Sequence, residues 1–127
     1  MPFINHVALW VKDLEKMTTF YTTFLAAIPG PRYHNPDIGF TSRFLTCGTG
    51  PRLELMHMDG LAEPLASRSF GYAHMAFSLG SSEAVDSLTH RLQSEGLRVI
   101  NGPRRTGDGY YESEVLDPEG NSIELTV

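Results

Sequence analysis

The sequence is poor in several features that mark particular classes of protein. Its 127 residues include one cysteine, Cys47, so no disulfide can form within the chain, and a reducing cytoplasm is the expected location. Lys and Arg number only 10 against 15 Asp and Glu, and the net charge of −5 disfavours a nucleic-acid partner. No segment approaches the about 20 continuous apolar residues of a membrane helix, and no signal-peptide pattern is present. We therefore expect a soluble cytoplasmic protein without a membrane partner.

The overall composition is that of an ordinary globular domain. Hydrophobic residues make up 41% of the chain and charged residues 20%, with no low-complexity tract. A chain of this length can form one compact domain, or two small repeats that share one core. It is too short for two independent domains.

A histidine-to-glutamate pattern occurs twice along the chain. His6 is followed by Glu54 after 48 residues, and His74 is followed by Glu124 after 50 residues. Each His begins an apolar run, and each Glu lies between two apolar residues. The chain therefore reads as a module at about 3–58, a linker at about 59–70 and a second module at about 71–127.

Periodicity predicts the same order of elements in both modules. Asp13 is a predicted helix N-cap, and the helix that follows ends before the Pro29–Gly30–Pro31 sequence, which opens a turn-rich stretch to Gly39. The predicted elements are strand 3–11, the helix after Asp13, strands 40–47 and 52–58, strand 71–79, helix 83–95, strand 97–100, a Gly/Pro/Arg loop, and strands 110–116 and 122–127. This order predicts two modules, the first either βαβββ or a shortened version of it and the second βαβββ.

Alternation along the strands places the repeated residues on one face. The neighbours of Glu54 and Glu124 are apolar, so they pack on the helix while the two carboxylates point to the opposite face. His6 and His74 fall on that same face by the same alternation. His57 lies three residues after Glu54, on the other face, and we expect a surface histidine there.

Two His and two Glu form a complete set of ligands for a divalent metal ion. A single carboxylate within an apolar strand is costly to bury unless it is paired or binds a metal. The ordinary alternative is two solvated glutamates and two histidines with local hydrogen bonds, but it does not explain four residues at matched positions. Such a set suits Ni, Co, Zn, Mn or Fe, and the ion would support proton transfer beside a carbonyl.

The residues around the pattern resemble the vicinal oxygen chelate superfamily, which includes glyoxalase I. The resemblance spans nearly the whole chain and is carried by 72–77, 117–125 and 53–56. It implies an α+β fold of two βαβββ modules that form a cupped mixed sheet. It also implies a homodimer, with metal ligands often drawn from both subunits.

Within that superfamily, a ligand set of His6, Glu54, His74 and Glu124 is most similar to bacterial glyoxalase I. The resemblance makes Glu124 the principal base and Glu54 the second ligating carboxylate. The substrate would be a small molecule such as a thiol adduct of a 2-oxoaldehyde. Trp10 and Met58 stand where bacterial glyoxalase I tends to carry an Arg and an Asn that hold glutathione. Their side chains would form an apolar wall of the site instead, so the sequence does not indicate which thiol the substrate contains.

Other functions stay open on the sequence. A dioxygenase or thiol transferase of the same superfamily would use three ligands, His6, His74 and Glu124. An epimerase of the superfamily is also open, although such epimerases tend to carry Gln where Glu54 stands. A non-enzymatic protein that binds a drug, as in bleomycin resistance, is the alternative outside enzymes. The residues that could bind a substrate carboxylate or phosphate are Arg43, Arg52, Arg104 and Arg105.

Overall fold

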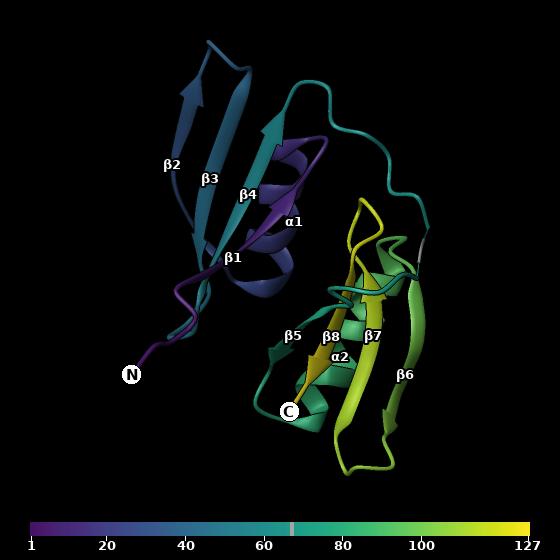
Figure 1. Cartoon of the computed structure of the whole chain (residues 1–127). Coiled ribbons are helices and arrows are strands. Elements are labelled where there is room, and N and C mark those ends of the chain that lie inside the picture. Colours follow the sequence, from purple (N-terminus) through teal and green to yellow (C-terminus); the bar gives the residue numbers. More distant parts are fainter. Residues whose placement is uncertain (67) are drawn as a thin grey trace. The chain divides into compact units, whose positions relative to one another are not determined.

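The computed structural model describes residues 1–66 and 68–127 as two compact units, Met1–Leu65 and Ala66–Val127. Each unit contains one helix and one sheet of four strands (Figure 1). The two units have the same order of elements, βαβββ. The α+β class and the two βαβββ modules predicted from the sequence are therefore confirmed.

In the first unit the first and last strands are neighbours. Its elements are β1 (His6–Trp10), α1 (Leu14–Leu25), β2 (Ile28–Asn35), β3 (Phe40–Thr46) and β4 (Arg52–Met58). The strand order is β1-β4-β3-β2, in which β1 and β4 run parallel and the other pairs are antiparallel. A residue at position 6 is thereby brought beside a strand that starts 46 residues later.

The helix α1 begins and ends at clear local signals. Asp13 has extended backbone, and its side chain accepts a hydrogen bond from the amide of Lys16, which satisfies one of the free donors of the first turn. Ala26 follows the last turn with a positive φ of 54° and ends the helix. The apolar face of α1 is buried through Leu14, Met17, Phe20 and Tyr21.

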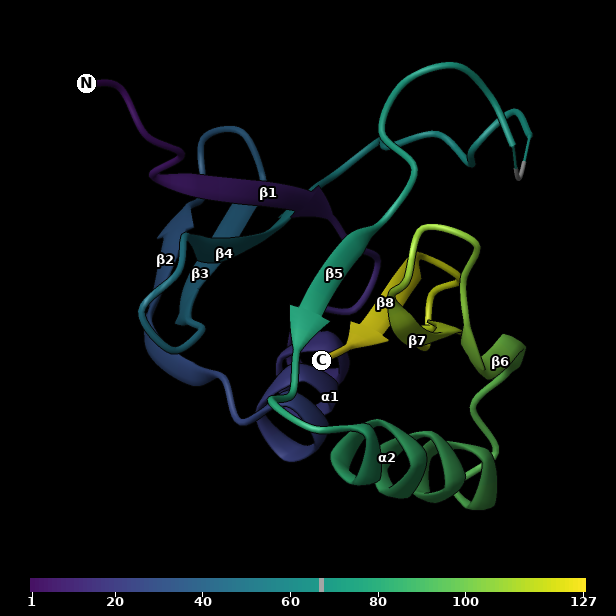
Figure 2. The same cartoon turned by 90° about the horizontal axis from the view of Figure 1, so that it is seen from below.

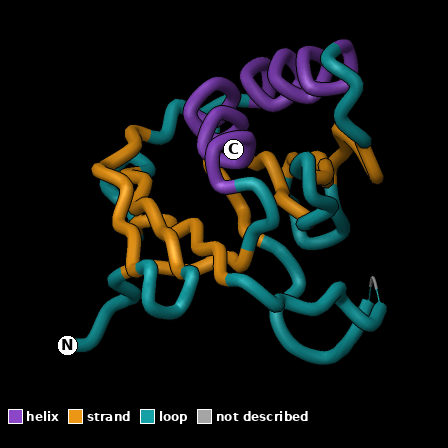
Figure 3. Tube along the Cα trace, turned by 90° about the horizontal axis from the view of Figure 1, so that it is seen from above, coloured by secondary structure: helices purple, strands orange, loops and turns teal. Residues whose placement is uncertain are grey.

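The second unit repeats this arrangement. Its elements are β5 (Met75–Ser78), α2 (Ser82–Ser94), β6 (Val99–Arg105), β7 (Tyr111–Leu116) and β8 (Ser122–Thr126), and the strand order is β5-β8-β7-β6. The first and last strands, β5 and β8, again pair in parallel. In each unit the helix lies along one face of its own sheet (Figures 2 and 3). Residues buried in the second core include Val85, Leu92, Val115, Ile123 and Leu125.

The stretch that follows α1 differs from the prediction. Residues 29–35 were expected to begin a turn-rich segment, but they belong to β2. Because β2 is an edge strand, prolines can be accommodated where no neighbour requires an amide donor. The register with β3 also shifts between Pro29 and Arg32. Proline and glycine therefore occur within an irregular edge strand here and do not replace it with a turn.

The edge strand β6 of the second unit also differs from the prediction. Residues 101–105 were predicted as a loop, whereas β6 continues through them with two shifts in its register against β7. The strand predicted at 71–79 is shorter than expected, because β5 begins only at Met75. His74 therefore lies just before the strand rather than within it.

We predict that Asp117 is critical for the turn that leads into β8. Its carboxylate is buried and accepts hydrogen bonds from the amides of Glu119 and Asn121, each at 2.9 Å. Asp117→Ala should lower the free energy of unfolding by about 2–4 kcal/mol, since buried donors lose a charged acceptor. Urea denaturation followed by circular dichroism measures this. Asp37→Ala, at an exposed turn, is the matched control, and an equal effect of both changes would contradict the prediction.

Candidate metal centre

His6 and Glu54 lie on neighbouring strands of the first unit. His6 opens β1, and Glu54 is in the middle of β4, where it pairs with Ala8 on one side and Phe44 on the other. The neighbours Leu53 and Leu55 are buried toward α1, so the carboxylate points to the opposite face, as predicted. The distance from His6 Nε2 to Glu54 Oε1 is 3.7 Å.

His74 and Glu124 form the corresponding pair in the second unit. Glu124 lies in β8 beside Ala76 of β5, and His74 precedes that strand by one residue. The distance from His74 Nε2 to Glu124 Oε1 is 3.1 Å. The histidine side chain is 39% exposed and the glutamate side chain 21% exposed, so both can be reached from solvent. Each unit thus contains one His–Glu pair, as the repeat predicts.

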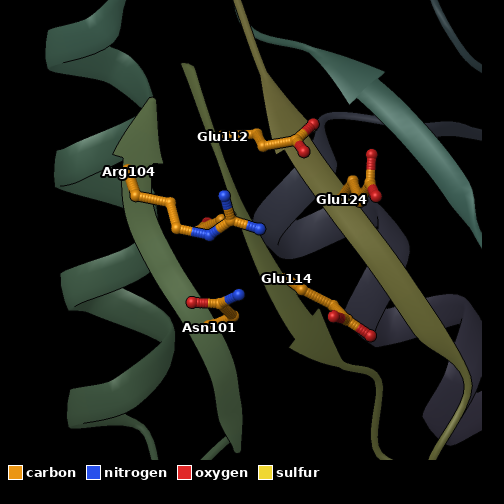
Figure 4. A pocket seen from close by; sticks show the side chains of 6 residues that line it. Asn101, Arg104, Glu112, Glu114 and Glu124 are labelled. Carbon is orange, nitrogen blue, oxygen red and sulfur yellow. The ribbon is translucent and has the colours of Figure 1, made fainter. Parts of the chain in front are cut away.

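Further acidic residues surround Glu124. Glu112 and Glu114 of β7 lie on the same face as Glu124, and all three line one pocket (Figure 4). Burial raises the pKa of Glu124, a hydrogen bond with Glu112 raises it further, and His74 lowers it. Glu124 therefore keeps a proton at higher pH than an ordinary glutamate does.

The spacing of Glu112 and Glu114 in the sequence was a signal that the prediction did not use. Glu112 and Glu114 are two apart in a predicted strand, so they must share a face. Only the pairing of β7 with β8 shows that this is the face of Glu124, because Glu114 is directly opposite it.

The arginines proposed as anion partners fall into different surroundings. Arg43 pairs with Glu15 of α1 at 3.0 Å, so it faces the helix rather than the face of Glu54. Arg105 donates a hydrogen bond within its own hairpin, and its guanidinium lies near the ring of Tyr111. Arg104 alone among these three lines the pocket of Glu124, into which its side chain extends from β6 (Figure 4).

His57 lies on the face predicted for it, but it is not a simple surface residue. Its side chain is 34% exposed, and Nδ1 is 2.7 Å from the carbonyl oxygen of Val11. This bond joins the end of β4 to the residue that follows β1. His57 is thus part of the packing between strand and helix, on the opposite face from Glu54.

The donor atoms of both pairs fit a divalent ion. Nitrogen and oxygen ligands lie about 2.0–2.2 Å from such a metal, so two ligands of one ion are roughly 2.9 Å apart at a right angle and roughly 4.2 Å apart when opposite. The observed separations of 3.7 and 3.1 Å are within this range. Within residues 1–66 and 68–127, no group of three or more His, Cys, Asp or Glu is close enough to hold a metal. Each unit therefore brings together two candidate ligands.

Comparison with known proteins gives the family. Residues 3–125 match the Glyoxalase/Bleomycin resistance protein/Dioxygenase superfamily. The chain belongs to this superfamily. Its members typically use a divalent metal ion and bind small molecules, which agrees with the chemistry of the two His–Glu pairs. None of the described helices is both long and apolar enough to cross a membrane.

Two relatives of known activity are similar over most of their length. Glutathione transferase FosA of Serratia marcescens is 28% identical over 98% of this chain and 79% of its own. The ethylmalonyl-CoA/methylmalonyl-CoA epimerase of Cereibacter sphaeroides is 31% identical over 76% of this chain and 73% of its own. The superfamily relationship thus includes enzymes of two different reaction types.

Solved structures confirm the fold. A domain of this superfamily from Frankia sp. has a TM-score of 0.85 and 20% identity, and covers 100% of this chain and 98% of that chain. Glyoxalase I of Leishmania major has a TM-score of 0.80 and 23% identity, with 99% and 86% covered.

We predict that Glu112 contributes, after burial, to the raised pKa of Glu124. Glu112→Gln should move the pKa of Glu124 part of the way toward its ordinary value, because a nearby negative charge is removed and the amide can donate to the ionised carboxylate. Carboxyl ¹³C NMR titration of the metal-free protein measures this. Glu114→Gln is the matched control, and it should have a smaller effect because only a weaker charge interaction is lost. Equal shifts in the two variants would refute the role of Glu112.

The raised pKa also fixes the sign of a stability effect. A carboxyl whose pKa is higher in the folded state stabilises the fold at low pH, and this contribution is lost as pH rises through the raised pKa. The metal-free wild type should therefore lose stability relative to Glu124→Gln as pH rises. Thermal unfolding across that pH range checks the sign.

Proposed function

We propose that the protein is a divalent-metal-dependent, glyoxalase I-like lyase or isomerase that acts as a homodimer. His6, Glu54, His74 and Glu124 would be the protein ligands of one ion. The observation that carries this proposal is the presence of one His–Glu pair at matched positions of both units, each with a separation that fits a shared ion. When bound, the ion would polarise a carbonyl or hydroxyl oxygen of the substrate as a Lewis acid.

Glu124 would be the general base for this reaction. A base must reach the proton that it takes, and the Glu124 side chain is 21% exposed beside His74. In a hemithioacetal of a 2-oxoaldehyde, it would take the proton from the carbon that carries sulfur and deliver it to the neighbouring carbon. The product is a thioester of a 2-hydroxy acid, so no atom or electron is gained or lost. Glu54 is the second ligating carboxylate.

Aromatic side chains on the sheet that carries the first pair favour an apolar substrate group. Trp10 is half exposed. The centroid of the Phe40 ring lies 6.3 Å from that of Trp10, in an edge-on contact, and 6.1 Å from that of Tyr33. Met58 is paired with Phe40 across the strands. A surface of this kind binds a flat apolar group better than the charged ends of a peptide-like thiol. The proposed substrate is therefore an adduct that carries an aryl or bulky apolar group.

A three-ligand thiol transferase or epimerase is the second candidate. The relatives from Serratia marcescens and Cereibacter sphaeroides favour it by their activities. In this case His6, His74 and Glu124 would suffice for the metal, and Glu54 would be dispensable. Full activity of Glu54→Ala in thiol addition or epimerisation would select this candidate over the isomerase.

We predict that metal binding requires the complete set of four residues. Protein purified without chelator should contain about one divalent ion per chain, and Glu124→Gln should lose most of it, because a neutral amide is a poorer ligand than a carboxylate. Elemental analysis with protein quantification gives the ratio. Glu83→Gln, at the exposed start of α2, is the control and should keep the metal. Full metal content in Glu124→Gln would refute the ligand set.

We also predict that Trp10 selects the substrate. Trp10→Ala should lower kcat/KM about tenfold for a phenylglyoxal hemithioacetal, which corresponds to roughly 1.4 kcal/mol of lost contact. The methylglyoxal adduct of the same thiol should change much less. The assay follows thioester formation on protein reloaded with Ni, Co, Zn or Mn. An equal loss for both adducts would show that Trp10 supports the fold rather than the aryl group.

A further inference from the structure

His6 and three neighbouring residues form a closed ring of contacts within the first unit. Arg52 Nη2 donates a hydrogen bond to Asn5 Oδ1 at 3.0 Å, and His6 Nδ1 lies 2.9 Å from the same oxygen. The guanidinium of Arg52 lies over the ring of Phe44 at 4.3 Å, and His6 meets that ring edge-on at 5.3 Å. Strand pairing sets this ring, since His6 of β1 is directly opposite Arg52 of β4.

The chemistry of these groups determines which nitrogen of His6 carries the proton. A guanidinium can only donate, so the atom of Asn5 that faces Arg52 is the carbonyl oxygen of its amide. A neutral imidazole nitrogen that faces this acceptor must itself donate. His6 Nδ1 therefore carries a hydrogen, and in the neutral imidazole Nε2 carries the lone pair.

The open nitrogen faces the carboxylate of Glu54. The separation of 3.7 Å from Nε2 to Oε1 is longer than a hydrogen bond. In the neutral imidazole, the lone pair of Nε2 and the carboxylate of Glu54 on the adjacent strand together favour a cation.

We propose that Asn5 and Arg52 are positioning residues that hold neutral His6 as the Nδ1–H tautomer and so present Nε2 as an open donor beside Glu54. Histidines that bind metals commonly donate their second nitrogen to a fixed acceptor, which sets the tautomer and the ring orientation. The inference rests on the proposed function for the identity of the ligand, but the tautomer is a property of the metal-free protein.

The second unit lacks both positioning residues. Ala73 stands before His74 where Asn5 stands before His6, and alanine has no side-chain acceptor. Ser122 stands two residues before Glu124 where Arg52 precedes Glu54, and its hydroxyl donates to Glu114 at 2.8 Å. In the described residues, no hydrogen bond to His74 Nδ1 is present. His74 is therefore an internal reference for His6.

The test measures the tautomer directly. Metal-free protein with ¹⁵N-labelled histidine is studied by long-range ¹H–¹⁵N correlation NMR at about pH 8.5, where imidazoles are ordinarily neutral. His6 is expected to show a protonated Nδ1 and an unprotonated Nε2. A protonated Nε2 at His6, which is the form that free imidazole side chains prefer in water, would overturn the proposal.

Variants separate positioning from folding. Asn5→Leu should convert His6 mainly to the Nε2–H tautomer and lower Zn²⁺ affinity about 10–100-fold, while the signals of His74 stay unchanged. Asn5→Asp should keep the wild-type tautomer, because a carboxylate still accepts from both Nδ1 and Arg52. Gln93→Leu, an exposed amide on α2, controls for the loss of an amide. An unchanged His6 tautomer in Asn5→Leu would contradict the proposal.

Zn²⁺ titration by calorimetry distinguishes this inference from the proposed function. The expected tautomer in a protein that binds no Zn²⁺ would support the role of Asn5 and Arg52 and contradict the proposed metal centre. Stoichiometric Zn²⁺ binding with His6 in the Nε2–H form would support the metal centre and overturn the positioning role.

Discussion

The parallel pairing of the first strand with the last strand of each unit is the interaction on which the candidate site depends. It places β1 beside β4 and β5 beside β8, although about 50 residues separate the paired positions. The pairing brings each histidine within 3.1–3.7 Å of its glutamate. Buried leucine and isoleucine neighbours then hold the carboxylates on the face away from the helices. Without this pairing, the repeated pattern would be only a feature of the sequence.

The two units have the same fold but prepare their ligands in different ways. In the first unit, an amide, a guanidinium and an aromatic ring surround His6 and fix its orientation. In the second unit, burial and then the acidic neighbours of Glu124 raise its pKa. Matched positions in the two units therefore have different chemical surroundings.

Much of the fold could be predicted from the sequence because its helices carry strong local signals. Asp13 and the apolar spacing after it define α1, and the strand around Glu54 was predicted with its observed bounds, Arg52–Met58. The edge strands β2 and β6 were missed in part because Pro and Gly normally indicate turns. Edge strands tolerate them, and only the strand order shows which strands are at the edge.

Four candidate ligand residues for the site could be identified from the sequence, but their surroundings could not. His6, Glu54, His74 and Glu124 were identified by repetition alone, and their pairing within each unit follows from the fold. The proximity of Glu112 to Glu124 depends on side-chain packing across β7 and β8, which no spacing in the sequence reveals.

A crystal structure of the Co²⁺-loaded protein, with anomalous diffraction at the cobalt edge, tests the central claim most directly. The account predicts one ion bound by Nε2 of His6 and of His74 and by carboxylate oxygens of Glu54 and Glu124. An ion bound by other residues, or well-ordered side chains of these four with no ion among them, would contradict it.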